Sequence, residues 1–328
     1  MKPSPRPWAH VAGLLLLCLF SACASSSSDK QDKPKRRFTE PTITTTGGAV
    51  GTGDVNVLFL ELNAQLENWN KLFINQTAKA DENRARALRE ELTYKSSRYQ
   101  VDLIEALETG PPRRRQIAAL ALGFSEPRDF PSDKGEPTRA HRVPPEGPLV
   151  AALNDSVPDV VGNAAFALGL KASATIPTRR LQELLSTSEH AKIRINAAWA
   201  LNQLTKAGAD VTGIDPIARR ALSDTEAGVR LQAALILAQR KDPESILGLA
   251  GLLRDEVNLP AAGAARSLAY IGSRVLELKG PCARALAGAL ADVRPEIREV
   301  IMSNLIVLAD RNYGEDVEEW QRWAARFP

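Results

Sequence analysis

Residues 229–237 read Val-Arg-Leu-Gln-Ala-Ala-Leu-Ile-Leu, and residues 193–201 repeat the pattern as Ile-Arg-Ile-Asn-Ala-Ala-Trp-Ala-Leu. In both stretches an apolar residue is followed four positions later by alanine and four positions after that by leucine. This spacing places all three on one face of a helix and is incompatible with a strand. Small residues in the middle of such a face let a neighbouring helix approach closely. The pattern therefore predicts closely packed α-helices.

The same pattern occurs six times between about residue 110 and the C-terminus. Each copy carries a pair of mostly small residues, with successive spacings of 46, 33, 36, 31 and 37, and a leucine stands four positions after the first member of every pair. The pairs are Ala118-Ala119, Ala164-Ala165, Ala197-Ala198, Ala233-Ala234, Ala264-Ala265 and the degenerate Ile301-Met302. A second apolar helix precedes each later copy, in Pro148–Leu153, Thr178–Leu185, Pro216–Leu222, Pro243–Leu253 and Pro281–Leu290, and several of these begin at proline. Each unit is thus predicted to be a helical hairpin.

These copies resemble HEAT repeats, in particular the short HEAT-like repeats of the phycobilisome-lyase type, over residues 98–328. The resemblance implies an all-α fold, an α-solenoid of about six hairpins. It also implies that Arg115, Arg194, Arg230 and Arg298 pair with an acid in the preceding turn. The family binds many kinds of partner, so the resemblance predicts the scaffold and leaves its partner open.

Both ends of the array are predicted to be capped, since an open solenoid exposes apolar faces at its termini. An N-terminal helical cap at 55–97 begins with a helix to Thr77 that carries the apolar stripe Leu58, Leu62, Leu66, Trp69 and Phe73. A second long helix is expected from Asp81 towards Leu107. At the other end, Trp320 and Trp323 follow Asp316 on one side of a helix, and either seal the last repeat or anchor a partner. A proline-rich loop at 126–147 is either a tolerated insertion or a recognition element.

The N-terminus has the features of an export signal. Lys2 and Arg6 precede an apolar run from Val11 to Phe20, which is too short to span a bilayer. The following Ser21-Ala22-Cys23 resembles a bacterial lipobox, although Phe20 departs from the usual aliphatic residue. The resemblance implies that 1–22 is removed as a lipoprotein signal peptide and that Cys23 is acylated. A conventional signal peptide cleaved near Ala22 or Ala24 is the alternative.

Residues 23–54 form a polar stretch that begins with four serines at 25–28 and is predicted to be a disordered linker. Together with the acylated terminus it would tether a folded body to a membrane. Ala24 rather than aspartate follows the cysteine, so we expect a lipid-anchored protein of the cell envelope, at the outer membrane facing the periplasm.

The composition argues against several functional classes. The 42 basic and 39 acidic side chains nearly balance, which supplies no broad basic surface for nucleic acid. The sequence holds neither a phosphate-binding glycine loop, nor a nucleophile motif, nor a metal-ligand spacing. We therefore expect no catalytic residues, no cofactor, no metal and no small-molecule substrate. Cys282 lies among helical alanines and is read as a buried filler, with a reactive thiol as the alternative.

The positive hypothesis is a groove for a peptide or protein on the concave face. The residue two positions after the first alanine of each pair tends to face that side in HEAT-like repeats. Here it is Leu120, Phe166, Trp199 and Leu235 in four successive copies, with Asn163 and Asn196 beside them as hydrogen-bonding groups. Packing of these side chains between repeats is the alternative, and burial of Phe166 and Trp199 beyond nine tenths would establish it.

The chain is accordingly expected to be a membrane-tethered, non-catalytic interaction scaffold for an unknown protein partner. A lyase-like enzyme or chaperone acting on exported substrates, and a purely structural spacer, are the competing hypotheses.

Overall fold

The computed structural model describes residues 52–74, 79–126 and 144–328. Regular secondary structure in these segments is entirely helical, which confirms the all-α prediction. The helices are α2 (Thr52–Ile74), α3 (Lys79–Arg98), α4 (Gln100–Thr109), α5 (Pro112–Leu122), α6 (Glu146–Ala152), α7 (Pro158–Lys171), α8 (Arg179–Thr187), α9 (Ala191–Lys206), α10 (Ile214–Ala221), α11 (Ala227–Arg240), α12 (Ile246–Leu252, preceded by a 3₁₀ turn at Pro243–Ser245), α13 (Asn258–Arg274), α14 (Leu276–Ala289), α15 (Pro295–Ala309) and α16 (Val317–Ala324).

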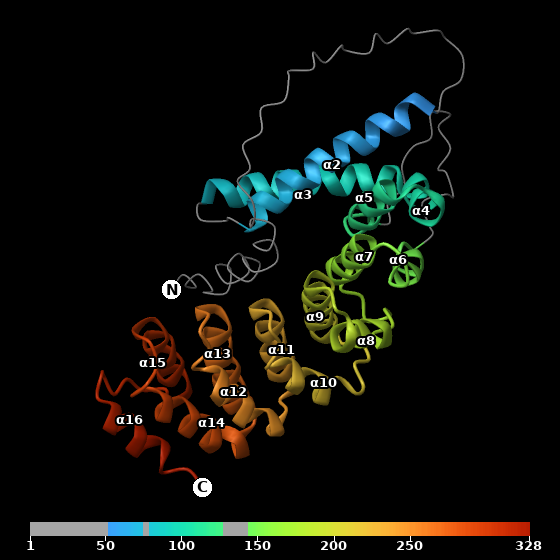
Figure 1. The fold of residues 1–328 in the computed structure, drawn as a ribbon. Helices are drawn as coiled ribbons and strands as arrows, with labels where there is room; N and C mark the ends of the chain where they lie inside the picture. The colour runs from blue at the N-terminus through green and yellow to red at the C-terminus, as the bar shows by residue number, and fades with distance from the viewer. Residues whose placement is uncertain (1–51, 75–78, 127–143) are drawn as a thin grey trace, which may run out of the picture.

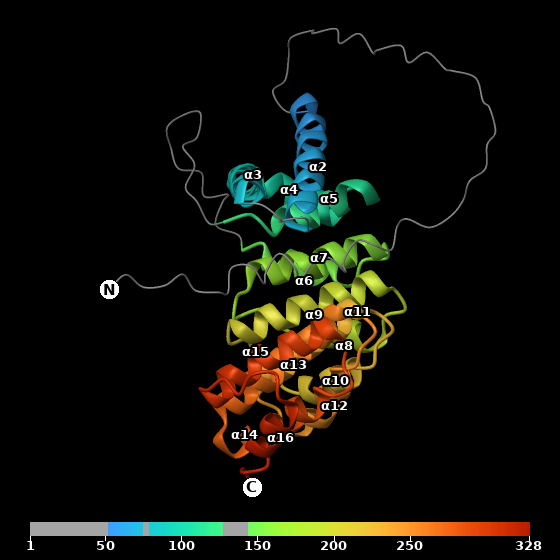
Figure 2. The same ribbon diagram turned by 90° about the vertical axis from the view of Figure 1, so that its left-hand side faces the viewer.

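Helices α4 to α15 form six consecutive hairpins that stack into an arc, as predicted. The second helices of the hairpins, α7, α9, α11, α13 and α15, line the inner side of the arc, and the first helices lie outside them (Figure 1). Figure 2 looks onto the inner layer, where α7 and α9 lie side by side. The structure is therefore an α-solenoid in which each hairpin packs on its neighbours.

The repeated pattern forms the core between these layers. The leucine of every copy is fully buried, and so is each of the ten alanines in the five Ala-Ala pairs. A glycine marks the closest approach of two inner helices: a Cβ placed on Gly169 of α7 would lie 2.4 Å from Trp199 Cζ3 of α9. Small residues thus set the spacing between repeats, and leucine fills the space around them.

Arginines link successive hairpins, but in the opposite direction from the one expected. Arg194 of α9 binds Asp224, in the turn of the following hairpin, through Nε–Oδ2 and Nη2–Oδ1 contacts of 2.8 and 2.9 Å. Its Nη1 also donates to the Ser188 carbonyl in its own turn, at 3.0 Å. Arg115 and Arg230 make the same double link, to Asp155 and Asp255 respectively. The prediction of an acid in the preceding turn was wrong because an arginine at this position reaches forward along the stack.

The N-terminal helices differ from the expectation in one respect. The stripe on α2 is buried at Leu58, Leu62, Leu66 and Trp69, as predicted, while the side chain of Phe73 lies outside the described part. The single long helix expected from Asp81 to Leu107 is interrupted at Tyr99, where ψ is 26°. Neither glycine nor proline causes this break; α3 packs mainly on α2, whereas α4 packs on α5 as the first helix of the first hairpin. Tertiary packing therefore overrides a continuous helical sequence.

The C-terminal helix α16 covers α14, the first helix of the last hairpin. Asp316 caps α16 by accepting hydrogen bonds from the backbone amides of Glu318 and Glu319. Trp320 is fully buried and Trp323 is 6% exposed, and α16 packs against α14. Both indoles are therefore part of the cap.

Two predicted boundaries need correction. Pro281 does not open a helix, because α14 begins at Leu276 and contains the proline in its interior. The loop expected to continue to Gly147 ends earlier, since α6 begins at Glu146. Its central part, residues 127–143, lies outside the described residues, as do the signal segment, Cys23 and the linker up to residue 51.

Among the described helices, none has the length and apolar character needed to cross a bilayer.

Candidate functional site

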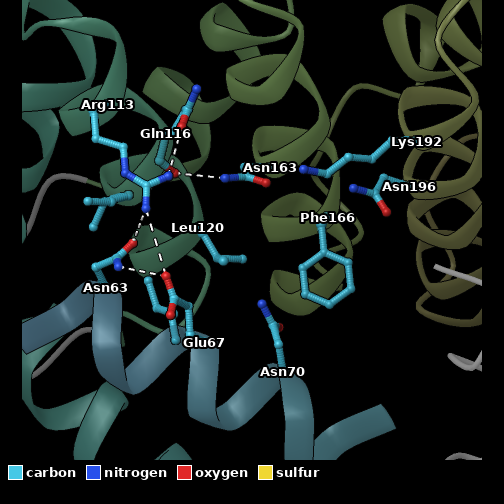
Figure 3. A pocket seen from close by; sticks show the side chains of 12 residues that line it. Asn63, Glu67, Asn70, Arg113, Gln116, Leu120, Asn163, Phe166, Lys192 and Asn196 are labelled. Atoms are coloured by element: carbon cyan, nitrogen blue, oxygen red, sulfur yellow. Dashed lines mark hydrogen bonds and ion pairs between the residues drawn. The ribbon is translucent and has the colours of Figure 1, made fainter. Parts of the chain in front are cut away.

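A pocket of about 150 Å³ lies where α2 meets the inner helices of the first three repeats. Figure 3 shows the side chains that surround it. Asn63, Glu67 and Asn70 come from α2, Arg113, Gln116 and Leu120 from α5, Asn163 and Phe166 from α7, and Lys192 and Asn196 from α9. Four of the six residues predicted for the concave strip line this pocket, namely Leu120, Asn163, Phe166 and Asn196.

Arg113 joins the two sides of the pocket. Its Nη2 donates to Asn63 Oδ1 at 2.8 Å and lies 3.8 Å from Glu67 Oε1, while its Nη1 donates to Gln116 Oε1 at 3.3 Å (Figure 3). Asn63 Nδ2 in turn donates to Glu67 Oε1 at 2.8 Å. The Arg113 and Glu67 side chains are more than half exposed, so this network forms the rim of the pocket and contributes little to stability.

The two predicted asparagines tie neighbouring helices together. Asn163 Nδ2 donates to the Gln116 carbonyl of α5 at 2.9 Å, and Asn196 Nδ2 donates to the Gly162 carbonyl of α7 at 2.9 Å. Each amide group is thereby held with its nitrogen on the backbone, which leaves the Oδ1 atom as an acceptor. The side chain of Asn70 makes no hydrogen bond with another described residue. The pocket therefore offers fixed acceptors and one carboxamide able both to donate and to accept.

The floor of the pocket is apolar. Leu66, Ile117 and Phe166 are each less than 9% exposed, and Leu120 is half-buried beside them. Lys192 stands at the far rim, where its Nζ donates to Asp159 at 2.8 Å. An apolar floor surrounded by a few oriented polar groups is the usual composition of a site that binds a peptide segment or a small ligand.

The prediction of an exposed apolar strip was wrong. Phe166 is 5% exposed and Trp199 is 7% exposed, and their rings stack with centroids 4.4 Å apart. Trp69 of α2 also contacts Phe166 in an edge arrangement, with ring centroids 6.3 Å apart. Leu235 is half-buried and is not among the residues that line the pocket. Phe166 and Trp199 are therefore core side chains, because α2 packs across the inner side and α9 follows closely on α7.

The contribution of α2 to the pocket was not predicted from the sequence. Asn63, Glu67 and Asn70 are spaced by four and three residues, so they form a polar row beside the apolar stripe of the same helix. That row was detectable in the sequence. The position of that row against α5 and α7 could not be predicted, because it depends on how α2 and α3 dock on the repeats.

Lys171, Cys282 and the acidic groups offer no alternative site. Lys171, at the end of α7, donates to the Ser125 carbonyl and hydroxyl, and burial lowers its pKa to about 8. Burial raises the pKa of the Cys282 thiol to about 12, and the residue is fully enclosed, which confirms the prediction of a filler. In the part of the chain that the structure describes, no three His, Cys, Asp or Glu side chains lie together as a metal site would need.

Comparison with known proteins assigns no family to this chain. No protein-family model matches the chain, and no curated protein matches it in sequence. Among solved structures, an engineered protein shares 20% identity over 83% of this chain and 76% of its own, with a TM-score of 0.48. YibA from Escherichia coli shares 18% over 81% of this chain and all of its own (TM-score 0.41), and human deoxyhypusine hydroxylase shares 18% over 79% of this chain and 99% of its own (TM-score 0.35). All of these TM-scores lie below 0.5, so the description of the chain as an all-α solenoid of helical hairpins rests on its own helices and their contacts.

Proposed function

We propose that this protein is a non-catalytic scaffold that binds an extended segment of a partner protein in the pocket between α2 and the inner helices of the first three repeats. The observation that supports this proposal is the composition of the pocket. The oriented carboxamides of Asn163 and Asn196, together with the carboxamide of Asn70, surround an apolar floor that includes Leu120. Carboxamides complement the N–H and C=O groups of an extended peptide, while the floor would accept one apolar side chain of that peptide.

A binding role suits this site better than catalysis. The only charged groups on the pocket lining are Glu67, Arg113 and Lys192, and each of them makes an ion pair within the described structure. An enzyme or chaperone acting on exported substrates, and a structural spacer, remain the competing functions that the experiment below addresses.

The experiment is photocrosslinking from the rim of the pocket. A photoreactive amino acid replaces Arg113, at the rim, or Arg179, which is 93% exposed on the outer helix α8 and serves as the matched control. Irradiation of intact cells should yield one protein adduct from position 113 that position 179 does not give. Identical adducts from both positions, or none from position 113, would contradict the proposal.

The proposal includes a place in the cell. The lipobox-like Ser21-Ala22-Cys23 and the polar residues 23–54 support a lipid tether through Cys23, with the solenoid held in the bacterial envelope on the periplasmic side of the outer membrane. Residues 52–328 would then meet their partner near the membrane surface. The tether and the pocket are independent parts of the proposal, and each has its own test.

A further inference from the structure

The last hairpin carries an arginine whose expected partner is missing from the described chain. Arg115, Arg194 and Arg230 stand three positions before the paired small residues of their helices, and each binds an aspartate of the next hairpin. Arg298 stands at the same position in α15, and α16 is the one helix that follows α15 among the described elements. Its backbone amide donates to the Arg294 carbonyl, but among the described residues its side chain has no hydrogen-bond or ion-pair partner, and the Nε atom is buried without an acceptor. A buried guanidinium nitrogen without an acceptor is unfavourable, so this site favours binding of a carboxylate.

The helix face beside Arg298 is apolar where a following repeat would pack. Met302 and Ile306 lie one and two turns further along α15, and both are only half-buried. In the interior helices the positions equivalent to Met302 are the alanines 165, 198, 234 and 265, all fully buried against a neighbour. Val307 beside them is 73% exposed. The larger side chains of α15 therefore extend into space that a neighbouring helix occupies elsewhere in the stack.

The cap does not close this face. Helix α16 packs against α14, the outer helix of the last hairpin, and leaves α15 at the open end of the arc (Figure 1). Terminal repeats usually present a polar outer face to keep the array soluble. The exposed Glu299 is the one acidic side chain between Arg298 and Met302 on this helix. The rest of the face combines an unpaired cation with apolar side chains at helical spacing.

We propose that the outer face of α15, formed by Arg298, Met302 and Ile306, docks a helical segment of a partner protein that carries an apolar stripe and an aspartate or glutamate paired with Arg298. The partner would extend the stack as a seventh hairpin does in a longer array. The charge argues for a different chain rather than a second copy, because a two-fold pairing would place this same face opposite itself, and Arg298, Met302 and Ile306 include no acidic residue to pair with Arg298. This surface lies at the opposite end of the solenoid from the pocket, and its binding does not depend on the pocket.

The test uses the full chain with the photocrosslinker p-benzoylphenylalanine in place of Ile306, and with the same group at Leu276 as a control. Leu276 is a 79% exposed apolar residue at the start of α14, away from the proposed face. Irradiation of intact cells should give a heterologous adduct from position 306 alone. The crosslinked residue, mapped by mass spectrometry, should lie on a helix within about one turn of an acidic residue.

Charge reversal at Arg298 distinguishes the proposed contact from nonspecific crosslinking. Arg298→Glu should reduce the adduct about tenfold or more, and changing the mapped acidic residue of the partner to arginine should restore it. Restoration also shows that the Arg298→Glu protein is folded. An adduct with a second copy of this chain, an adduct insensitive to Arg298→Glu, equal labelling from position 276, or no adduct would each overturn the proposal.

Discussion

Removing the carboxylate of Asp224 should destabilise the solenoid far more than removing that of Asp292, although both bind arginine through two contacts. Asp224 accepts from Arg194 Nε and Nη2 at 2.8 and 2.9 Å and from the Glu226 amide at 2.9 Å, and both side chains of the pair are only 14% exposed. Asp292 accepts from Arg254 at 2.9 and 3.0 Å, but these side chains are about half exposed. The two pairs therefore differ mainly in burial.

The expected free energies follow from that difference. Breaking a fully buried pair costs about 3–5 kcal/mol, and the residual exposure of Arg194 lowers the cost of Asp224→Ala to about 2–3 kcal/mol. Asp292→Ala should cost less than about 1 kcal/mol. In urea, with a slope of about 2–3 kcal/mol/M, Asp224→Ala should lower the unfolding midpoint by about 1 M, measured by circular dichroism on the full chain. Equal shifts for the two variants would refute the role assigned to the inter-repeat pairs.

The same pair gives a pH dependence of known sign. Burial acts to raise the pKa of Asp224, but the hydrogen bonds from Arg194 and the Glu226 amide outweigh it and hold the pKa below its ordinary value. The stabilisation is therefore present above the unfolded-state value of about 3.9 and is lost as the pH falls through the lower folded value. The stability difference between wild type and Asp224→Ala should shrink below about pH 4. A difference that stayed constant down to about pH 2 would contradict this assignment.

Three further changes test other features of the structure. Gly169→Ala should destabilise the protein by about 1–3 kcal/mol because the new Cβ meets the Trp199 ring. Gly288→Ala on α14, where a new Cβ would meet no atom within 4 Å, should stabilise the protein by about 0.5–1 kcal/mol. Melting temperatures that shifted in the same direction in both variants would contradict the close packing of α7 on α9. Because burial holds the Lys171 pKa at about 8, the free energy of unfolding should rise between about pH 8 and pH 10 by up to about 1.4 kcal/mol per pH unit. Lys171→Met should remove this rise. An unchanged pH dependence of the unfolding free energy, measured by urea titration of the variant, would contradict the assignment to Lys171. Cys23→Ser should abolish labelling by an alkyne fatty acid and release the protein from membranes, and continued membrane retention in high salt would exclude the lipid tether.

The sequence predicted the repeat unit well because the signal is local and recurs. An alanine pair and a leucine at helical spacing identify the buried face of a helix, and six copies reinforce one another. The direction of the Arg194 link could not be obtained in this way. It depends on which turn lies within reach of the guanidinium once the hairpins stack, a relation between residues about thirty positions apart.

The candidate site was predicted only in part, because it too depends on contacts between residues that are distant in the sequence. Leu120, Asn163 and Asn196 follow from the repeat register, and they do line the pocket. The burial of Phe166 arises from the docking of Trp69, which belongs to a helix outside the repeats. Asn70 enters the pocket through that same docking. Where a non-repeating element packs on a repeating one, periodicity gives no register between them.

The most direct test of the binding site compares Asn70→Arg with Asn68→Arg. Both variants add the same charge to α2, but only residue 70 lines the pocket, and residue 68 is exposed outside it. The measured quantity is the dissociation constant for the partner identified by crosslinking from position 113. The account predicts about tenfold or greater weakening for Asn70→Arg and less than about twofold change for Asn68→Arg. Equal affinities of the two variants would contradict binding in this pocket.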